Sequence, residues 1–240
     1  MTGSEVKGRW RRVLRYSFAG ALLLLAGISL LVGSSWYLPL GIAVTGGIIL
    51  VGQRRIFRPG VNRSGDEIVC RYIPWYEGNA YVLNVLVPAL GVSSVGAGWA
   101  PGNPGWLRFT GLTLLILTPV FVFSAVRMWR RCLLAISPSA LTVRLAGPKD
   151  ELTEIRRDCV LAIGPKIVPN GVSGQSLQVE IAYRAADLSS KTVLLGLQLS
   201  VQPVNLVNAL VAWKDGANDE PGQLIDRIER VLRGRTTAGV

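Results

Sequence analysis

The pattern of hydrophobic and polar residues divides the chain at about residue 130. Before this point the apolar residues form four long runs, over about residues 16–32, 37–52, 80–99 and 106–126. A helix needs about 20 mostly apolar residues to cross the hydrocarbon core of a bilayer. The pattern therefore predicts four membrane-spanning helices. They form two hairpins, because only 33–36 and 100–105 separate their members.

Beyond residue 130 the apolar runs become short and alternate with polar residues. Leu177, Val179 and Ile181, for example, are separated by single polar side chains, which is the period-two pattern of a half-buried strand. Six such strands are predicted, over residues 132–136, 141–145, 152–156, 159–168, 177–184 and 192–197. Short strands with tight turns between them favour a small antiparallel barrel or sandwich.

Two helices are predicted after the strands. Pro203 opens the first and Pro221 the second, in which apolar residues recur at helical spacing from Leu224 onward. On the opposite face Asp226 and Arg230 are placed to pair across a turn. Because this face mixes acidic and basic residues, we expect the last helix to cap the barrel rather than lie on a membrane, where a more uniformly basic face is typical.

The charge distribution indicates a membrane topology. Residues 1–128 hold 12 basic and 4 acidic side chains, whereas residues 129–240 hold 14 and 11, so the excess of the net +11 lies beside the predicted spans. Thirteen basic residues flank one side of the spans and only Arg108 flanks the other. The positive-inside rule then places both termini and the loop 53–79 in the cytoplasm. No nucleic-acid partner is predicted.

The residue types argue against an active site. The chain contains no histidine, which removes the commonest general base and metal ligand. Its three cysteines, Cys70, Cys132 and Cys159, have neither a redox nor a zinc spacing, and we interpret them as reduced, mostly buried thiols. We therefore predict no catalytic residue, no metal site and no cofactor.

Two sets of residues are candidates for binding. Basic side chains beside the spans are suited to anionic lipid head groups, each worth about 1 kcal/mol near an anionic leaflet, although topology alone also explains them. These candidates are Arg11, Arg12, Arg54, Arg55 and Arg58. The third span carries small or polar residues at helical spacing, which serve either packing within the helices or a partner's face. These candidates are Asn84, Ala89, Ser93 and Ala97.

The loop between the second and third spans leaves two interpretations open. Its segment Ile68–Tyr76 mixes apolar and aromatic residues with Arg71 and Pro74. This segment is either interfacial or an extra strand of the cytoplasmic domain.

A weak resemblance covers about residues 130–200. The segments Leu133–Arg144 and Arg156–Ile163, after a membrane hairpin, resemble bacterial membrane-anchored proteins with pleckstrin-homology-like domains. The resemblance implies a small barrel closed by a helix and a binding or assembly module rather than an enzyme. Two C-terminal helices in place of one depart from that pattern.

These observations predict a multi-pass protein of a bacterial inner membrane. Its expected parts are a basic N-terminus (1–15), a transmembrane domain (16–128) and a cytoplasmic β-rich α+β domain (129–240), a barrel capped by helices. The leading hypothesis is a non-enzymatic accessory or scaffold subunit of another integral membrane complex. Lipid importers of the Mce type are one such complex, although no motif points to them. The alternatives are an inner-leaflet lipid-binding or envelope-stress module and a small transporter.

Overall fold

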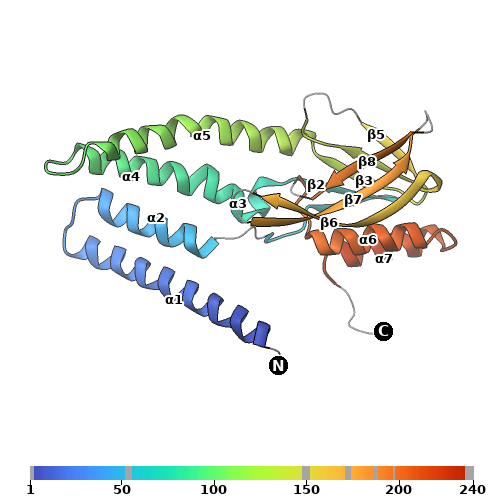
Figure 1. The fold of residues 1–240 in the computed structure, drawn as a ribbon, viewed down its shortest axis with the longest axis horizontal. Coiled ribbons are helices and arrows are strands. Elements are labelled where there is room, and N and C mark those ends of the chain that lie inside the picture. The colour runs from blue at the N-terminus through green and yellow to red at the C-terminus, as the bar shows by residue number, and fades with distance from the viewer. Residues whose placement is uncertain are drawn as a thin grey trace. The chain divides into compact units, whose positions relative to one another are not determined.

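The computed structural model describes residues 3–51, 56–147, 152–170, 174–185, 189–196 and 198–235, without the side chains of 3–9, 11, 12, 170, 174 and 175 (Figure 1). The chain forms two compact units. The helical unit comprises Met1–Arg55 and Gly78–Ala125, and the sheet unit comprises Ile56–Glu77 and Val126–Val240. Most of the loop predicted within the transmembrane domain therefore belongs to the sheet unit.

The helical unit contains the predicted apolar segments. Its helices are α1 (Gly3–Leu31), α2 (Tyr37–Val51), α3 (Gly78–Tyr81), the π-helical η2 (Val82–Leu86), α4 (Val87–Trp99) and α5 (Trp106–Arg131), whose last residues from Val126 belong to the sheet unit. Three stretches of the described chain are long and apolar enough to cross a membrane: Val13–Leu31, Gly78–Trp99 and Trp106–Arg131.

The prediction of four spans is therefore wrong by one. Helix α2 is apolar throughout but has only 15 described residues. At 1.5 Å per residue it reaches about 22 Å, short of a hydrocarbon core about 30 Å thick. Residues 52–55, which follow it, lie outside the description.

Small residues bring the helices of this unit close together. A Cβ atom added to Gly46 of α2 would lie 3.3 Å from the carbonyl oxygen of Ala19 in α1. Added to Gly111 of α5, it would lie 2.6 Å from the carbonyl oxygen of Gly91 in α4. The backbones approach at these crossings because glycine has no side chain to hold them apart.

The sheet unit contains two antiparallel sheets. The first has the order β1 (Val61–Ser64), β2 (Glu67–Arg71), β3 (Leu133–Ile136), β4 (Ala140–Arg144) and β5 (Thr153–Arg156). The second has the order β6 (Val160–Asn170), β7 (Gly174–Arg184) and β8 (Ser190–Leu195). The six predicted strands thus form as β3 to β8, with bounds that differ by a few residues.

The predicted closed barrel does not form among the described strands. The short 3-10 helix η3 (Arg157–Cys159) separates β5 from β6, which are not paired, so the strands stay in two sheets. One face of each sheet contributes to a common core, which includes Ile68, Leu134 and Leu141 from the first sheet and Ile181 from the second. The result is an open α+β arrangement.

Two C-terminal helices complete this core, as the sequence predicts. They are α6 (Pro203–Asp215), with Trp213 fully buried, and α7 (Pro221–Leu232), with Leu224 and Ile228 at most 1% exposed. Packing of the last helix on the domain is therefore confirmed.

The expected pairing of Asp226 with Arg230 across a turn of α7 is wrong. Among the described residues, the carboxylate of Asp226 instead pairs with Arg63 of β1, and Arg230 donates to the backbone oxygen of Asp226.

The structure supports the strand interpretation for part of the middle loop. Residues 68–71 of the segment belong to strand β2, which joins β3 with Cys70 opposite Leu134, whereas residues 74–76 form the 3-10 helix η1 (Pro74–Tyr76). Strand β1, which the sequence analysis did not predict, then pairs with β2 at the edge of the sheet. Residues between the second and third apolar helices therefore supply two of the five strands.

Candidate functional site

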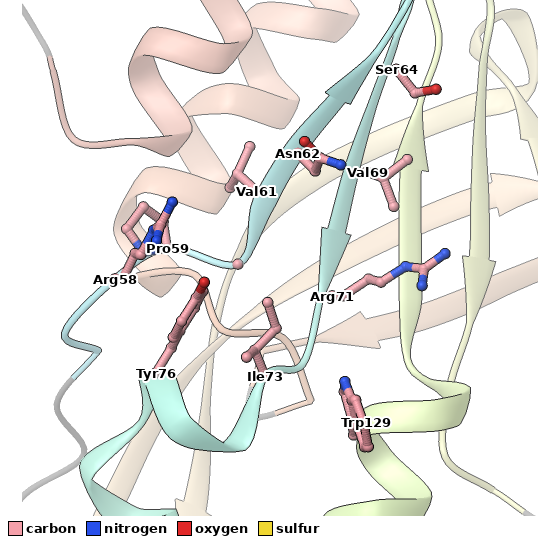
Figure 2. A pocket seen from close by; sticks show the side chains of 11 residues that line it. Arg58, Pro59, Val61, Asn62, Ser64, Val69, Arg71, Ile73, Tyr76 and Trp129 are labelled. Atoms are coloured by element: carbon pink, nitrogen blue, oxygen red, sulfur yellow. The ribbon is translucent and has the colours of Figure 1, made fainter.

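The sheet unit carries a groove of about 550 Å³ at one end of β1 and β2 (Figure 2). Most of its lining comes from the segment between the second and third apolar helices, with one residue from α5. The lining residues are Arg58, Pro59, Gly60, Val61, Asn62, Ser64, Val69, Arg71, Ile73, Tyr76 and Trp129.

A hydrogen-bond network centred on Ser200 holds the walls of the groove. The Gly60 amide donates to the Ser200 carbonyl over 2.7 Å, and the Ser200 amide donates to the Arg71 carbonyl over 3.2 Å. The Ser200 hydroxyl accepts from the Ile73 amide at 2.9 Å and donates to Oε1 of the buried Glu77 at 2.8 Å. One buried serine thus anchors the chain before β1 and the chain after β2.

Glycine is required at position 60 by this network. A Cβ atom there would lie 2.4 Å from the carbonyl oxygen of Arg71 and 3.1 Å from the Cβ atom of Ser200. The amide of Arg71 also donates to the carbonyl of Gly60 over 2.9 Å. The two walls therefore meet through backbone atoms at the base of the groove.

Arg58 forms the first cationic side of the groove. Its guanidinium carbon lies 5.3 Å from the centre of the Tyr76 ring, within the range of a cation–π contact. The tyrosine is held in turn by the 3-10 helix η1 (Pro74–Tyr76), and its carbonyl accepts from the Phe57 amide at 2.8 Å. Arg58 is nevertheless exposed to solvent.

Arg71 forms the second cationic side. It ends β2 opposite Leu133 of β3, so its side chain projects from the outer face of the sheet, where it is exposed. Trp129 lies on the same side of the groove, and its ring packs edge-on against Trp75 with centroids 5.0 Å apart (Figure 2). This side therefore combines an exposed cation with a pair of aromatic rings.

The remainder of the lining is neutral. Ile73 supplies apolar surface between the two arginines, and Val69, Asn62 and Ser64 line the groove farther along β1 and β2 (Figure 2). None of the eleven lining residues is acidic. The groove is thus suited to an anionic ligand that also has apolar and hydroxylated parts.

The five arginines predicted to bind lipid differ in what the structure shows of them. Arg58 lines the groove. Arg54 and Arg55 lie outside the described residues, and Arg11 and Arg12 belong to α1 with side chains that are not described. The structure therefore places one of the five in the site.

The predicted face of the third span lies in the helical unit, outside this site. The Ser93 hydroxyl donates to the Tyr37 carbonyl over 2.6 Å, so it packs α4 against the start of α2. Ala89 and Ala97 are half-buried. Asn84 lies in the π-helical turn, where Nδ2 donates to the Ala80 carbonyl at 2.8 Å and the buried Oδ1 has no partner among the described residues.

Neither the cysteines nor the carboxylates suggest a reactive centre. Burial raises the pKa of the Cys70 thiol to about 12, so it stays protonated at neutral pH. Cys132 is buried and Cys159 half-buried. Within the described residues no group of three or more Cys, Asp and Glu side chains is placed to hold a metal ion.

Sequence reasoning missed Arg71, Tyr76 and Trp129 as members of one site. A signal was present, because Glu67, Val69 and Arg71 alternate with Ile68 and Cys70 in the pattern of a half-buried strand. That alternation predicts that Arg71 leaves the core face. The contribution of Trp129 depends on the pairing of β2 with β3, which local pattern does not specify.

Comparison of the chain with protein-family models, with curated proteins and with solved structures finds no match.

Proposed function

We propose that this protein is a non-enzymatic membrane protein whose sheet unit binds anionic lipid head groups. The observation that carries the proposal is the groove with Arg58 and Arg71 on its sides, an aromatic ring beside each of them, apolar surface between them and no acidic residue in its lining. Guanidinium groups form charge-assisted hydrogen bonds with phosphate. Trp and Tyr favour the region where lipid head groups meet acyl chains.

Covalent continuity with apolar helices supports a lipid rather than a soluble anion. Tyr76 precedes by two residues the stretch Gly78–Trp99, and Trp129 lies near the end of the stretch Trp106–Arg131. If these stretches cross the membrane with the predicted orientation, the groove residues are tethered to the inner leaflet. The basic residues then also attract anionic lipids through the negative surface potential.

Native mass spectrometry of the full-length protein in detergent tests this proposal. We expect phosphatidylglycerol to bind at least about tenfold more tightly than phosphatidylcholine, the size of a good charge-assisted contact. Replacing both groove arginines, in the double variant Arg58→Gln and Arg71→Gln, is expected to abolish this preference.

A matched control removes two charges elsewhere on the sheet unit. Arg156 ends β5 at the far edge of the first sheet and Arg184 ends β7, and both are exposed. The double variant Arg156→Gln and Arg184→Gln is expected to retain the preference. Equal loss in both double variants would show that only net charge matters, and the proposal would then be abandoned.

The accessory-subunit hypothesis is the second candidate. It is favoured by the half-buried Ala89 and Ala97, which keep exposed surface on α4 although Ser93 between them is engaged. Small residues of this kind allow another helix to approach closely. Purification at native expression levels is expected to recover a stoichiometric membrane partner, and substitution of both alanines by leucine is expected to release it. A partner retained by that variant would argue against this use of α4.

A further inference from the structure

The two cations of the groove do not converge on one point. Figure 2 shows Arg58 with Tyr76 on one side, Arg71 with Trp129 on the other and Ile73 between them. Cations that bind a single phosphate lie around it, so cations on two sides of a groove indicate a ligand with two anionic groups.

The Arg58 side chain and the Arg71 backbone are each held by contacts on their own side. Arg58 lies over the ring of Tyr76, which belongs to η1. The backbone of Arg71 is fixed, because its amide donates to the Gly60 carbonyl, its carbonyl accepts from the Ser200 amide, and its strand pairs with β3. A single phosphate placed against one guanidinium would leave the other without a partner.

The surface between the arginines also describes the ligand. Ile73, which lies between them, is apolar, so the part of the ligand that joins two anionic groups is uncharged. Tyr76 beside Arg58 and Trp129 beside Arg71 supply aromatic surface for apolar chains. A matching ligand is a lipid with two anionic groups joined by a short neutral linker.

We infer that the groove is selective for a lipid with two phosphates, of the diphosphatidylglycerol class. One phosphate lies against Arg58 and the other against Arg71, while the linking glycerol lies over Ile73. The hydrocarbon near the phosphates covers the ring of Trp129. This inference rests on the proposed function and specifies the head group that the site prefers.

A competition between two lipids tests it with the full-length protein in detergent. Diphosphatidylglycerol and phosphatidylglycerol are titrated at equal total phosphate, and bound lipid is counted by native mass spectrometry. We expect diphosphatidylglycerol to bind at least about tenfold more tightly, the effect of one additional charge-assisted contact.

Single variants separate the two contacts. Arg58→Gln and Arg71→Gln are each expected to lower the affinity for diphosphatidylglycerol about tenfold, to the level of phosphatidylglycerol. The affinity for phosphatidylglycerol is expected to change less than about threefold, because the remaining arginine still binds one phosphate. Arg156→Gln, an exposed charge on the same sheet, is the control and is expected to change neither affinity.

The outcomes distinguish this inference from the proposal on which it rests. Equal affinity for both lipids, with both lost in the double groove variant, would overturn the two-phosphate inference and leave head-group binding intact. Affinities that no groove variant changes would overturn both. Competition by chain-free glycerol bisphosphate as strong as that by the lipid would identify a soluble ligand and overturn the lipid assignment.

Discussion

The two units are packed internally by different kinds of residue, small ones in the helical unit and large apolar ones in the sheet unit. In the helical unit close approaches occur at Gly41, Gly98 and Gly111, where a single added carbon would lie 2.6 Å from an atom of a neighbouring helix. In the sheet unit the core is filled by large side chains, and Trp213 is its largest fully buried member. This contrast is the one expected if the helical unit lies in a membrane, because lipid supplies no hydrophobic force between helices and close packing takes its place, whereas a core formed in water gains stability from buried apolar area.

The difference predicts that the two units respond in opposite ways to changes in side-chain size. Removing atoms should damage the sheet unit most, and adding atoms should damage the helical unit most.

The largest effect is expected from Trp213→Ala. The Trp213 ring is fully buried, stacks under the Arg157 guanidinium at 4.9 Å and donates from Nε1 to the Ser137 carbonyl at 2.7 Å. Truncation of a buried tryptophan costs about 3–5 kcal/mol of unfolding free energy. Chemical denaturation followed by near-UV circular dichroism measures this loss. Val204→Ala, at a side chain 56% exposed on the same helix, is the control and should change little.

A smaller loss of stability, caused by adding an atom rather than removing several, is expected from Gly111→Ala. The new Cβ atom would lie 2.6 Å from the Gly91 carbonyl oxygen, so α4 and α5 must separate. We expect a loss of about 1–3 kcal/mol although alanine is the better helix former. The control is Gly27→Ala, because a Cβ atom there meets nothing within 4 Å. If both variants unfold equally easily in mixed micelles, close packing where α4 crosses α5 is contradicted.

The sheet unit is also expected to lose stability at high pH through Cys70. Burial raises the pKa of the folded Cys70 thiol to about 12, from 9.0 for the free thiol. Above pH 9 the unfolded state therefore binds fewer protons than the folded state, and the free energy of unfolding falls as pH rises. The loss reaches about 1 kcal/mol by pH 10. Cys70→Ala should show a shallower decrease between pH 9 and 10, and an unchanged slope would refute the assignment.

The smallest effect is expected from the ion pair between Arg63 and Asp226. It joins β1 to α7 on the surface, and its hydrogen bond raises the pKa of Arg63. Exposed pairs contribute little and are screened by salt. Asp226→Asn should therefore lower the melting temperature slightly at low salt and not at all at 1 M salt. A large shift that persists at high salt would show that the carboxylate has a further role.

The sequence predicts these two units unequally. Apolar runs and period-two alternation locate the apolar segments and strands β3 to β8 because both patterns are local. The helix count fails at α2, whose described part ends at Val51. The prediction of a barrel is wrong because closure depends on whether β5 pairs with β6, and pairing between strands is a non-local property.

The site was less predictable than the fold. The sequence marks Arg58 as a candidate for lipid binding because it lies near an apolar run. Arg71 counts there only among the basic residues that indicate the membrane orientation. The two come together with Trp129 because β2 pairs with β3 and Ser200 bonds both walls. Those contacts join residues more than 60 positions apart in the sequence, and no local pattern records them.

Photocrosslinking in native membranes tests head-group binding most directly. A benzophenone amino acid at Val69 lines the groove, whereas the same group at Ile167, 64% exposed on β6, does not. We predict an adduct with an anionic lipid at position 69 that is lost when Arg58 and Arg71 are both replaced by glutamine, and none at position 167. Absence of a lipid adduct at position 69, or equal adducts at both positions, would contradict a head-group site in this groove.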